Sequence, residues 1–172
     1  STIQLGTNVV IVPEHQPAVL AKSVATLDVL SGGRVQLGVG VGELPEEYGA
    51  VGMEFTDRGK RMDEYLAAMR MLWRDEVATF HGEHVQFDQV RCDPSPVRGT
   101  VPIHIGGASP AALRRAARFG DGYFPWIGPQ LDFPTTLRRI VADIRVECER
   151  HGRDPDEIEY TVGGARTADE AA

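Results

Sequence analysis

The sequence predicts an α/β fold built from parallel β/α units, and three observations support this prediction. Two apolar runs rich in β-branched residues, 3–12 and 35–41, are typical of strands buried on both faces. A helical pattern follows each run, so strands and helices alternate along the chain. A third apolar run, 103–105, leads through two glycines directly into another helix. This alternation fits both a closed barrel and an open doubly wound sheet, and the pattern alone does not separate them.

Two long amphipathic patterns predict helices in the first half of the chain. The first helix is expected from Pro17 to the glycine pair that follows Ser31. Its predicted buried face consists of Leu20, Val24, Leu27, Val29 and Leu30. A polar, glycine-bearing segment, 44–56, leads to the longest helix, which Thr56 or Asp57 can cap. The predicted core face of that helix consists of Met62, Tyr65, Leu66, Met69, Leu72 and Trp73.

The remaining patterns predict a hairpin and the last β/α elements. Residues 79–88 alternate weakly around a central glycine, which favours a small hairpin. Short strands are expected at 123–124 and 158–162. An amphipathic helix over 132–150 lies between them in the sequence, and its apolar face consists of Leu137, Ile140, Val141, Ile144 and Cys148.

Composition excludes several classes of protein. At 172 residues, with 25% charged and 42% hydrophobic residues, the chain is expected to be one ordinary globular domain. A net charge of −7 argues against a nucleic-acid surface. Cys92 and Cys148 are too few for a disulfide framework, which favours reduced thiols and a cytoplasmic location. No membrane span or signal peptide is predicted, and the start at Ser1 suggests a processed chain or a fragment.

A strand, two glycines and a capped helix predict an anion site at residues 106–109. Ser109 is a suitable N-cap, and Pro110 suits the first position of a helix over 111–119. Gly120 is expected to end that helix in the left-handed conformation. The unpaired first-turn amides and the positive helix end favour a phosphate, which glycine allows to approach the backbone. The alternative is that Gly106 and Gly107 only form a tight strand-to-helix turn.

Parallel β/α folds place their sites at the carboxyl ends of the strands. Four places fit this rule: Asn8-Val9, residues 40–43, residues 106–109 and Pro125-Trp126. Glu43 is the strongest candidate acid or base, because it follows a glycine-rich strand end where a carboxylate is expected to be partly desolvated. The alternative is a solvent-facing glutamate like its neighbours.

The histidines do not predict a metal site. His81 and His84 belong to the predicted hairpin and have no third ligand nearby in the sequence. His104 lies inside a strand, where a hydrogen-bonded core histidine is the expected reading, and His15 is left undecided. No serine, histidine and acid arrangement for a nucleophilic triad is found.

Four consecutive blocks carry a family resemblance: LGTNVVIVP, PAVLAKSVATLDVLSGGRVQLGVGVGE, RGKRMDEYLAAMRMLW and PIHIGGASPAALRRAARFGDGYFP. In this order they resemble the bacterial luciferase-like superfamily, and within it the actinobacterial coenzyme F420-dependent oxidoreductases. The resemblance implies a (β/α)8 TIM barrel that uses F420, or alternatively FMN, for hydride transfer or monooxygenation of a small organic substrate. About five of the eight strands are present, so 1–172 is expected to be one partial barrel domain lacking the first two β/α units and the last strand.

The resemblance also implies site residues. Family members have a bulge with a non-prolyl cis peptide behind the cofactor ring, which corresponds here to Asn8-Val9, with Thr7 beside it. The family's IGGxS loop holds the cofactor phosphate and corresponds to Gly106, Gly107, Ala108 and Ser109. A glutamate in the position of Glu43 is the proton donor in sugar-phosphate dehydrogenases of this branch.

Two alternatives to an enzyme of this family remain at the level of sequence. The chain could be a non-catalytic remnant that binds cofactor or assists assembly, or an unrelated sugar-phosphate barrel. In each case an incomplete barrel leaves strand edges and apolar helix faces uncovered. We therefore expect the chain to form a homodimer or to self-associate in another way, with no nucleic-acid or membrane partner.

Overall fold

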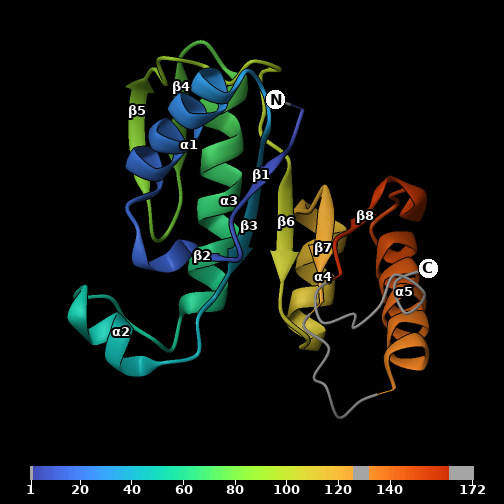
Figure 1. Ribbon diagram of the computed structural model, residues 1–172. Coiled ribbons are helices and arrows are strands. Elements are labelled where there is room, and N and C mark those ends of the chain that lie inside the picture. Colours follow the sequence, from blue (N-terminus) through green and yellow to red (C-terminus); the bar gives the residue numbers. More distant parts are fainter. Residues whose placement is uncertain (1, 126–131, 163–172) are drawn as a thin grey trace. The chain divides into compact units, whose positions relative to one another are not determined.

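The computed structural model describes residues 2–125 and 132–162, and the chain divides into two compact units, Ser1–Pro102 and Ile103–Ala172 (Figure 1). The first unit contains β1 (Leu5–Gly6), β2 (Val10–Ile11), η1 (Val12–Glu14), α1 (Pro17–Ser31), β3 (Val35–Gly40), α2 (Pro45–Ala50), α3 (Arg58–Arg74), β4 (Ala78–His81) and β5 (Gln86–Val90). The second contains β6 (Ile103–Gly106), α4 (Pro110–Phe119), β7 (Gly122–Phe124), α5 (Phe133–Arg150), η2 (Pro155–Glu157) and β8 (Glu159–Tyr160). Strands and helices alternate in both units, which confirms the predicted α/β class.

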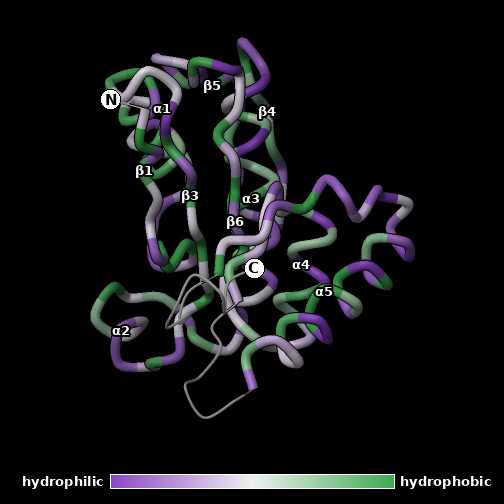
Figure 2. The backbone as a smooth tube through the Cα atoms, turned by 45° about the vertical axis from the view of Figure 1, so that its right-hand side comes forward, coloured by the Kyte–Doolittle hydropathy of each residue, from purple (hydrophilic) through white to green (hydrophobic). Residues whose placement is uncertain are grey.

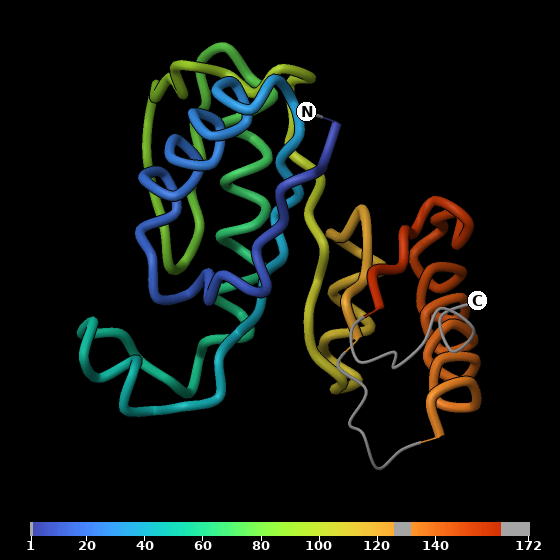
Figure 3. Tube along the Cα trace, in the orientation of Figure 1, coloured from blue at the N-terminus to red at the C-terminus, as the bar shows by residue number. Residues whose placement is uncertain are grey.

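In the first unit, β1 and β2 both pair in parallel with β3 (Figure 3). Leu5 lies opposite Val35, and Val10 lies opposite Val39. The sequence predicted a strand over 3–12, broken by Gly6 and Asn8 and buried on both faces, and the predicted burial is wrong. The strand is interrupted between Gly6 and Val10, and β1 is exposed, because among the described residues it pairs with β3 alone and so lies at an edge.

Helix α1 begins and ends where the sequence predicted, but it buries a different face. The Gln16 side chain caps its start, and Gly32 ends it with a φ of 71°. Its buried residues are Pro17, Ala21, Val24, Ala25 and Asp28. Leu27 and Leu30, predicted to be core, are 57% and 79% exposed. The small side chains face inward because α3 packs closely there, and the Trp73 indole N–H donates to the Ala21 carbonyl at 2.9 Å.

Helix α3 supplies much of the core of the first unit. All six residues predicted for its core face are buried. Asp57 occupies the N-cap position, as one of the two predicted caps, but its side chain makes no capping hydrogen bond. It pairs with Arg61 on the next turn instead. The helix start is thus fixed by this ion pair and by packing.

The predicted hairpin is confirmed, and a single carboxylate holds its turn. Strands β4 and β5 pair antiparallel. Glu64 on α3 accepts hydrogen bonds from the backbone N–H groups of His84 and Val85, both at 2.7 Å, and of Glu83 at 2.9 Å. A carboxylate that satisfies three turn amides fastens the hairpin to the helix.

Glu64→Ala is therefore expected to lower the free energy of unfolding by roughly 3 kcal/mol, because three amides lose a charged acceptor. Urea denaturation followed by circular dichroism measures this change. The matched control is Glu149→Ala, which removes an exposed glutamate from α5 and should change stability by less than about 0.5 kcal/mol. Equal midpoints for Glu64→Ala and the wild type would contradict this account of the turn.

In the second unit, β6, β7 and β8 form a parallel sheet in which Gly106 lies opposite Phe124. Helix α4 begins at Pro110 as predicted, and the Ala112 N–H donates to the Ser109 hydroxyl oxygen at 3.2 Å. Helix α5 is capped by Asp132, which accepts from the Thr135 N–H. Each of the five predicted barrel strands thus contains an observed strand.

Gly120 does not adopt the predicted left-handed conformation. Its φ of −83° and ψ of 142° are extended, and glycine is needed there for close packing. A Cβ at this position would lie 2.9 Å from the carbonyl oxygens of Ala116 and Gly122. The Arg153 guanidinium donates to the Gly120 carbonyl, so the end of α4 is satisfied by a side chain from a distant segment.

The hydropathy colouring of Figure 2 shows the apolar residues distributed along the strands and helices of both units. Among the helices of the described segments, none combines the length and the apolar character that crossing a membrane requires.

Candidate functional site

The interruption between β1 and β2 forms a bulge at Thr7, Asn8 and Val9. The Asn8-Val9 peptide is cis, as the family resemblance implied. The Thr7 hydroxyl donates to the Gly38 carbonyl oxygen at 2.8 Å and ties the bulge to β3. All three bulge residues are exposed, so a ligand can reach them.

Two glycines of β3 allow this bulge to lie against the strand. A Cβ on Gly38 would overlap the carbonyl oxygen of Thr7, and a Cβ on Gly40 would lie 2.8 Å from Cγ2 of Val9. Any larger side chain at Gly38 therefore requires the bulge backbone to move. The two glycines of the GVG part of the sequence motif are thus explained by the close approach of the Thr7 backbone and of the Val9 side chain.

Glu43 lies three residues beyond the end of β3, after Gly42 in the left-handed conformation at φ 67°. The sequence argument expected a partly desolvated carboxylate, and this expectation is wrong, because Glu43 is exposed. No hydrogen bond or ion pair joins it to another residue of the described segments. The carboxylate is consequently free to reach a ligand at the carboxyl end of β3.

The short helix α2, which the sequence patterns did not reveal, holds the chain after Glu43. Its Tyr48 is fully buried, and the phenol O–H donates to the Val41 carbonyl oxygen at 2.6 Å. Burial raises the pKa of Tyr48 to about 12, so the phenol remains a neutral donor at physiological pH. Six residues are too few for a recognisable helical period, and only Pro45 at its first position signals this element.

Glu14 is a further candidate that the sequence patterns did not single out. It lies in η1, directly after β2. Because β2 and β3 are parallel, this position is at the carboxyl ends of both strands. Its Oε1 atom is buried and has no hydrogen-bond partner among the described residues. Burial and, to a smaller extent, the charge of Glu47 raise the pKa of Glu14. A carboxylate in such surroundings is suited to proton transfer.

In the second unit, the loop 106–109 has the geometry of an anion site. Gly107 has a φ of 113°, which side chains rarely allow. Gly107, Ala108 and Ser109 are exposed at the start of a ten-residue helix whose first turn carries no acidic residue. The Tyr123 hydroxyl donates a hydrogen bond to the Gly107 carbonyl and so holds the loop in place. Burial raises the pKa of Tyr123 to about 12. The loop therefore fits a phosphate group.

The remaining candidates either form contacts within the fold or lie outside the described residues. His104 is buried, and its Nδ1 lies 3.1 Å from the Thr161 hydroxyl, as expected for a hydrogen-bonded core histidine. His81 pairs with Asp88 at 2.7 Å. Within the described segments no three His, Cys, Asp or Glu residues are grouped to hold a metal. Trp126 lies outside the described residues.

The sequence model of the luciferase-like monooxygenase family matches residues 1–171. The chain belongs to the luciferase-like monooxygenase family. An uncharacterized protein of Mycobacterium tuberculosis is 37% identical over 161 residues, covering 90% of this chain and 54% of that protein. The F420-dependent glucose-6-phosphate dehydrogenase of Kineococcus radiotolerans is 33% identical over 166 residues, covering 94% of this chain and 48% of the dehydrogenase.

Solved structures of luciferase-like proteins give the same result. An F420-dependent secondary alcohol dehydrogenase, in complex with an F420-acetone adduct, matches with a TM-score of 0.80 and 26% identity, covering 92% of this chain and 48% of that one. The predicted family and the α/β fold of the luciferase-like barrel type are therefore confirmed. The chain spans about half the length of the relatives it matches.

Proposed function

We propose that the chain carries the cofactor-binding elements of an F420-dependent oxidoreductase that acts on a small hydroxylated substrate, with FMN as the alternative cofactor. The observation that carries this proposal is the exposed bulge at Thr7, Asn8 and Val9, which lies so close to Gly38 that only glycine fits there. The relatives whose names include F420 support this cofactor for a chain that is 33% identical to one of them.

In this proposal the bulge at Thr7, Asn8 and Val9 offers a backbone surface for the cofactor ring. Considered by itself, the loop at Gly107, Ala108 and Ser109 offers backbone amides and a hydroxyl to a phosphate group. When bound, the cofactor supplies hydride transfer. Glu43 accepts the proton of the substrate hydroxyl when the substrate is oxidised, and returns it in the reverse direction.

A non-catalytic module that binds the cofactor is the second candidate, because the chain spans only about half of its relatives. Titration with F420 and with FMN, followed by absorbance and fluorescence, tests the shared part of both proposals. Saturable binding of either cofactor is expected, and its absence would contradict both. Reduction of bound F420 by glucose 6-phosphate or by a secondary alcohol then separates an enzyme from a binding module.

Gly107→Val is expected to weaken cofactor binding at least tenfold. A β-branched residue is strongly disfavoured at a φ of 113°, and its Cβ would lie 3.3 Å from the Ala112 Cβ. The same titration measures this change. Gly99→Val is the matched control, since Gly99 also has a positive φ, 71°, but lies in a loop of the first unit with nothing near its Cβ position. Equal affinity in Gly107→Val and in the control would remove the loop from the proposed site.

A further inference from the structure

We propose that the groove enclosed by α1, α3 and β5 binds a free alkyl carboxylate, with the hydrocarbon chain along the groove and the carboxylate beside Lys22. We call this hollow the α1–β5 groove. It lies entirely within the first unit. The proposal does not depend on the cofactor or on the reaction proposed above.

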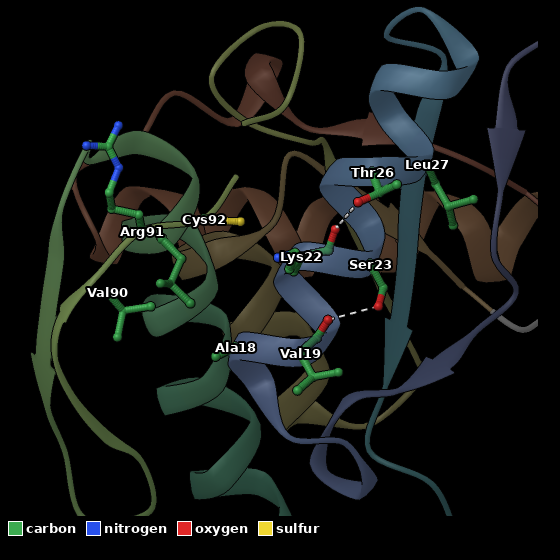
Figure 4. Close-up of a pocket in the computed structure, with 10 residues that line it drawn as sticks. Ala18, Val19, Lys22, Ser23, Thr26, Leu27, Val90, Arg91 and Cys92 are labelled. Atoms are coloured by element: carbon green, nitrogen blue, oxygen red, sulfur yellow. Dashed lines mark hydrogen bonds between the residues drawn. The ribbon is translucent and has the colours of Figure 1, made fainter. Parts of the chain in front are cut away.

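The α1–β5 groove has the size and the lining of a small-molecule site. Its volume is about 740 Å³, and ligand pockets range from about 300 to 1,000 Å³. Its lining is mainly apolar, and it is open to solvent. Figure 4 shows side chains entering it from α1 and from residues 90–92. It is lined by Ala18, Lys22 and Leu27 of α1, Leu72 of α3, Val90 of β5 and Arg91 after it.

The charged residues that line the groove are both basic. Lys22 and Arg91 belong to its lining, and no Asp or Glu of the described segments does. The whole chain, by contrast, has a net charge of −7. A hollow that carries one sign of charge concentrates ligands of the opposite sign. The groove therefore favours an anion, although the protein as a whole repels anions.

Lys22 is the cation that is available to this anion. Its side chain is exposed and forms no hydrogen bond or ion pair within residues 2–125 and 132–162. Arg91 already pairs with the exposed Glu76 at 3.2 Å. Burial raises the pKa of the Cys92 thiol in the groove lining, and the charge of Lys22 opposes this rise. The Lys22 ammonium is therefore close enough to the groove to act on a group inside it.

The hydroxyl groups of the α1 wall are already used within the helix. The Ser23 hydroxyl donates to the Val19 carbonyl at 2.9 Å, and the Thr26 hydroxyl donates to the Lys22 carbonyl at 2.8 Å (Figure 4). Neither hydroxyl proton is left for an anion. The Lys22 ammonium is consequently the donor that this wall offers, and the remaining wall contacts an apolar chain.

Charge and lining together select an amphipathic ligand. A phosphate ion would pair with Lys22 but would gain nothing from the apolar walls, and a neutral hydrocarbon would not use the charge. An alkyl carboxylate uses both, because its chain leaves water along the walls and its head accepts a charge-assisted hydrogen bond. The net charge of −7 disfavours approach to an anionic membrane surface. We therefore assign a free carboxylate, not a lipid held in a bilayer.

Isothermal titration calorimetry with decanoate tests the proposal on the 172-residue chain. The wild type is expected to bind with a dissociation constant of about 0.1–1 mM, as for a single-chain ligand in an open groove. Lys22→Met keeps an unbranched apolar side chain and removes the charge. It is expected to weaken decanoate binding about fivefold, the upper end for an exposed ion pair. Because the Lys22 side chain is exposed, the variant should fold normally.

Lys60→Met is the matched control, since Lys60 is the other lysine of the chain and is exposed on α3 outside the groove lining. It should bind decanoate as the wild type does. Decanol is the control ligand, because it has the same chain without the charge. Its affinity should be equal in the wild type and in Lys22→Met. Ala18→Leu fills part of the groove and should weaken both ligands about tenfold.

Absence of saturable decanoate binding to the wild type overturns the proposal. Equal decanoate affinity in Lys22→Met and in the wild type also overturns it, because Lys22 would then not recognise the carboxylate. Unchanged affinity in Ala18→Leu would place the binding site outside the groove. Decanoate binding that weakens as the protein concentration rises would show that a second copy of the chain fills the groove instead.

Discussion

Glu43→Gln is expected to lower the rate of F420 reduction by about 100- to 10,000-fold, the usual contribution of a general acid or base. Glutamine keeps the size and polarity of the side chain but cannot exchange a proton. Glu43 is exposed after Gly42, beyond the end of β3, and forms no hydrogen bond or ion pair with the described residues. Cofactor affinity should therefore stay unchanged, so that the loss appears in kcat alone.

Two further variants make this result specific. Glu46→Gln changes an exposed glutamate on α2 and should keep wild-type turnover. Glu14→Gln tests the other carboxylate, which lies directly after β2. Burial raises the pKa of Glu14. Wild-type turnover in Glu43→Gln, combined with a large loss in Glu14→Gln, would transfer the proton-transfer role to Glu14.

Gly38→Val is expected to abolish measurable cofactor binding and to destabilise the first unit by about 1–3 kcal/mol, the range for overpacked sites. The new Cβ would overlap the backbone carbonyl oxygen of Thr7. A flexible side chain could turn away from such an overlap, but a carbonyl moves only with its backbone. The bulge must then leave β3, and the hydrogen bond from the Thr7 hydroxyl to the Gly38 carbonyl is lost with it.

The expected loss of stability and of cofactor binding depends on which atoms the new Cβ of each variant would contact. Gly40→Ala should be milder, since its Cβ would lie 2.8 Å from a side-chain methyl of Val9. Gly49→Ala is the control, because nothing lies within 4 Å of its Cβ position and alanine is favoured in helix α2. Thermal melts and the F420 titration measure both properties. A Gly38→Val protein that binds cofactor normally would show that the bulge is not part of the site.

The sequence determined the local elements of this protein, because short-range chemistry specifies them. Ser109 and Pro110 start α4, Gly32 ends α1, and the 3.6-residue period of α3 gives all of its buried residues except Ala68. The ordered motifs also identified the family. These features depend on neighbouring residues along the chain, so no partner segment needed to be known.

Only the tertiary structure decided what packs against each element. Leu27 and Leu30 have the period of a core face, yet Ala21 and Ala25 are buried, because close contact with α3 selects small side chains. Gly120 marks a helix end in sequence, but its conformation follows from the carbonyls that surround it. Likewise, the exposure of Glu43, the burial of the Glu14 Oε1 atom and the close approach of Thr7 to Gly38 depend on contacts between separate segments. Hydrophobic period identifies a face that can be buried, and long-range packing decides which face is buried.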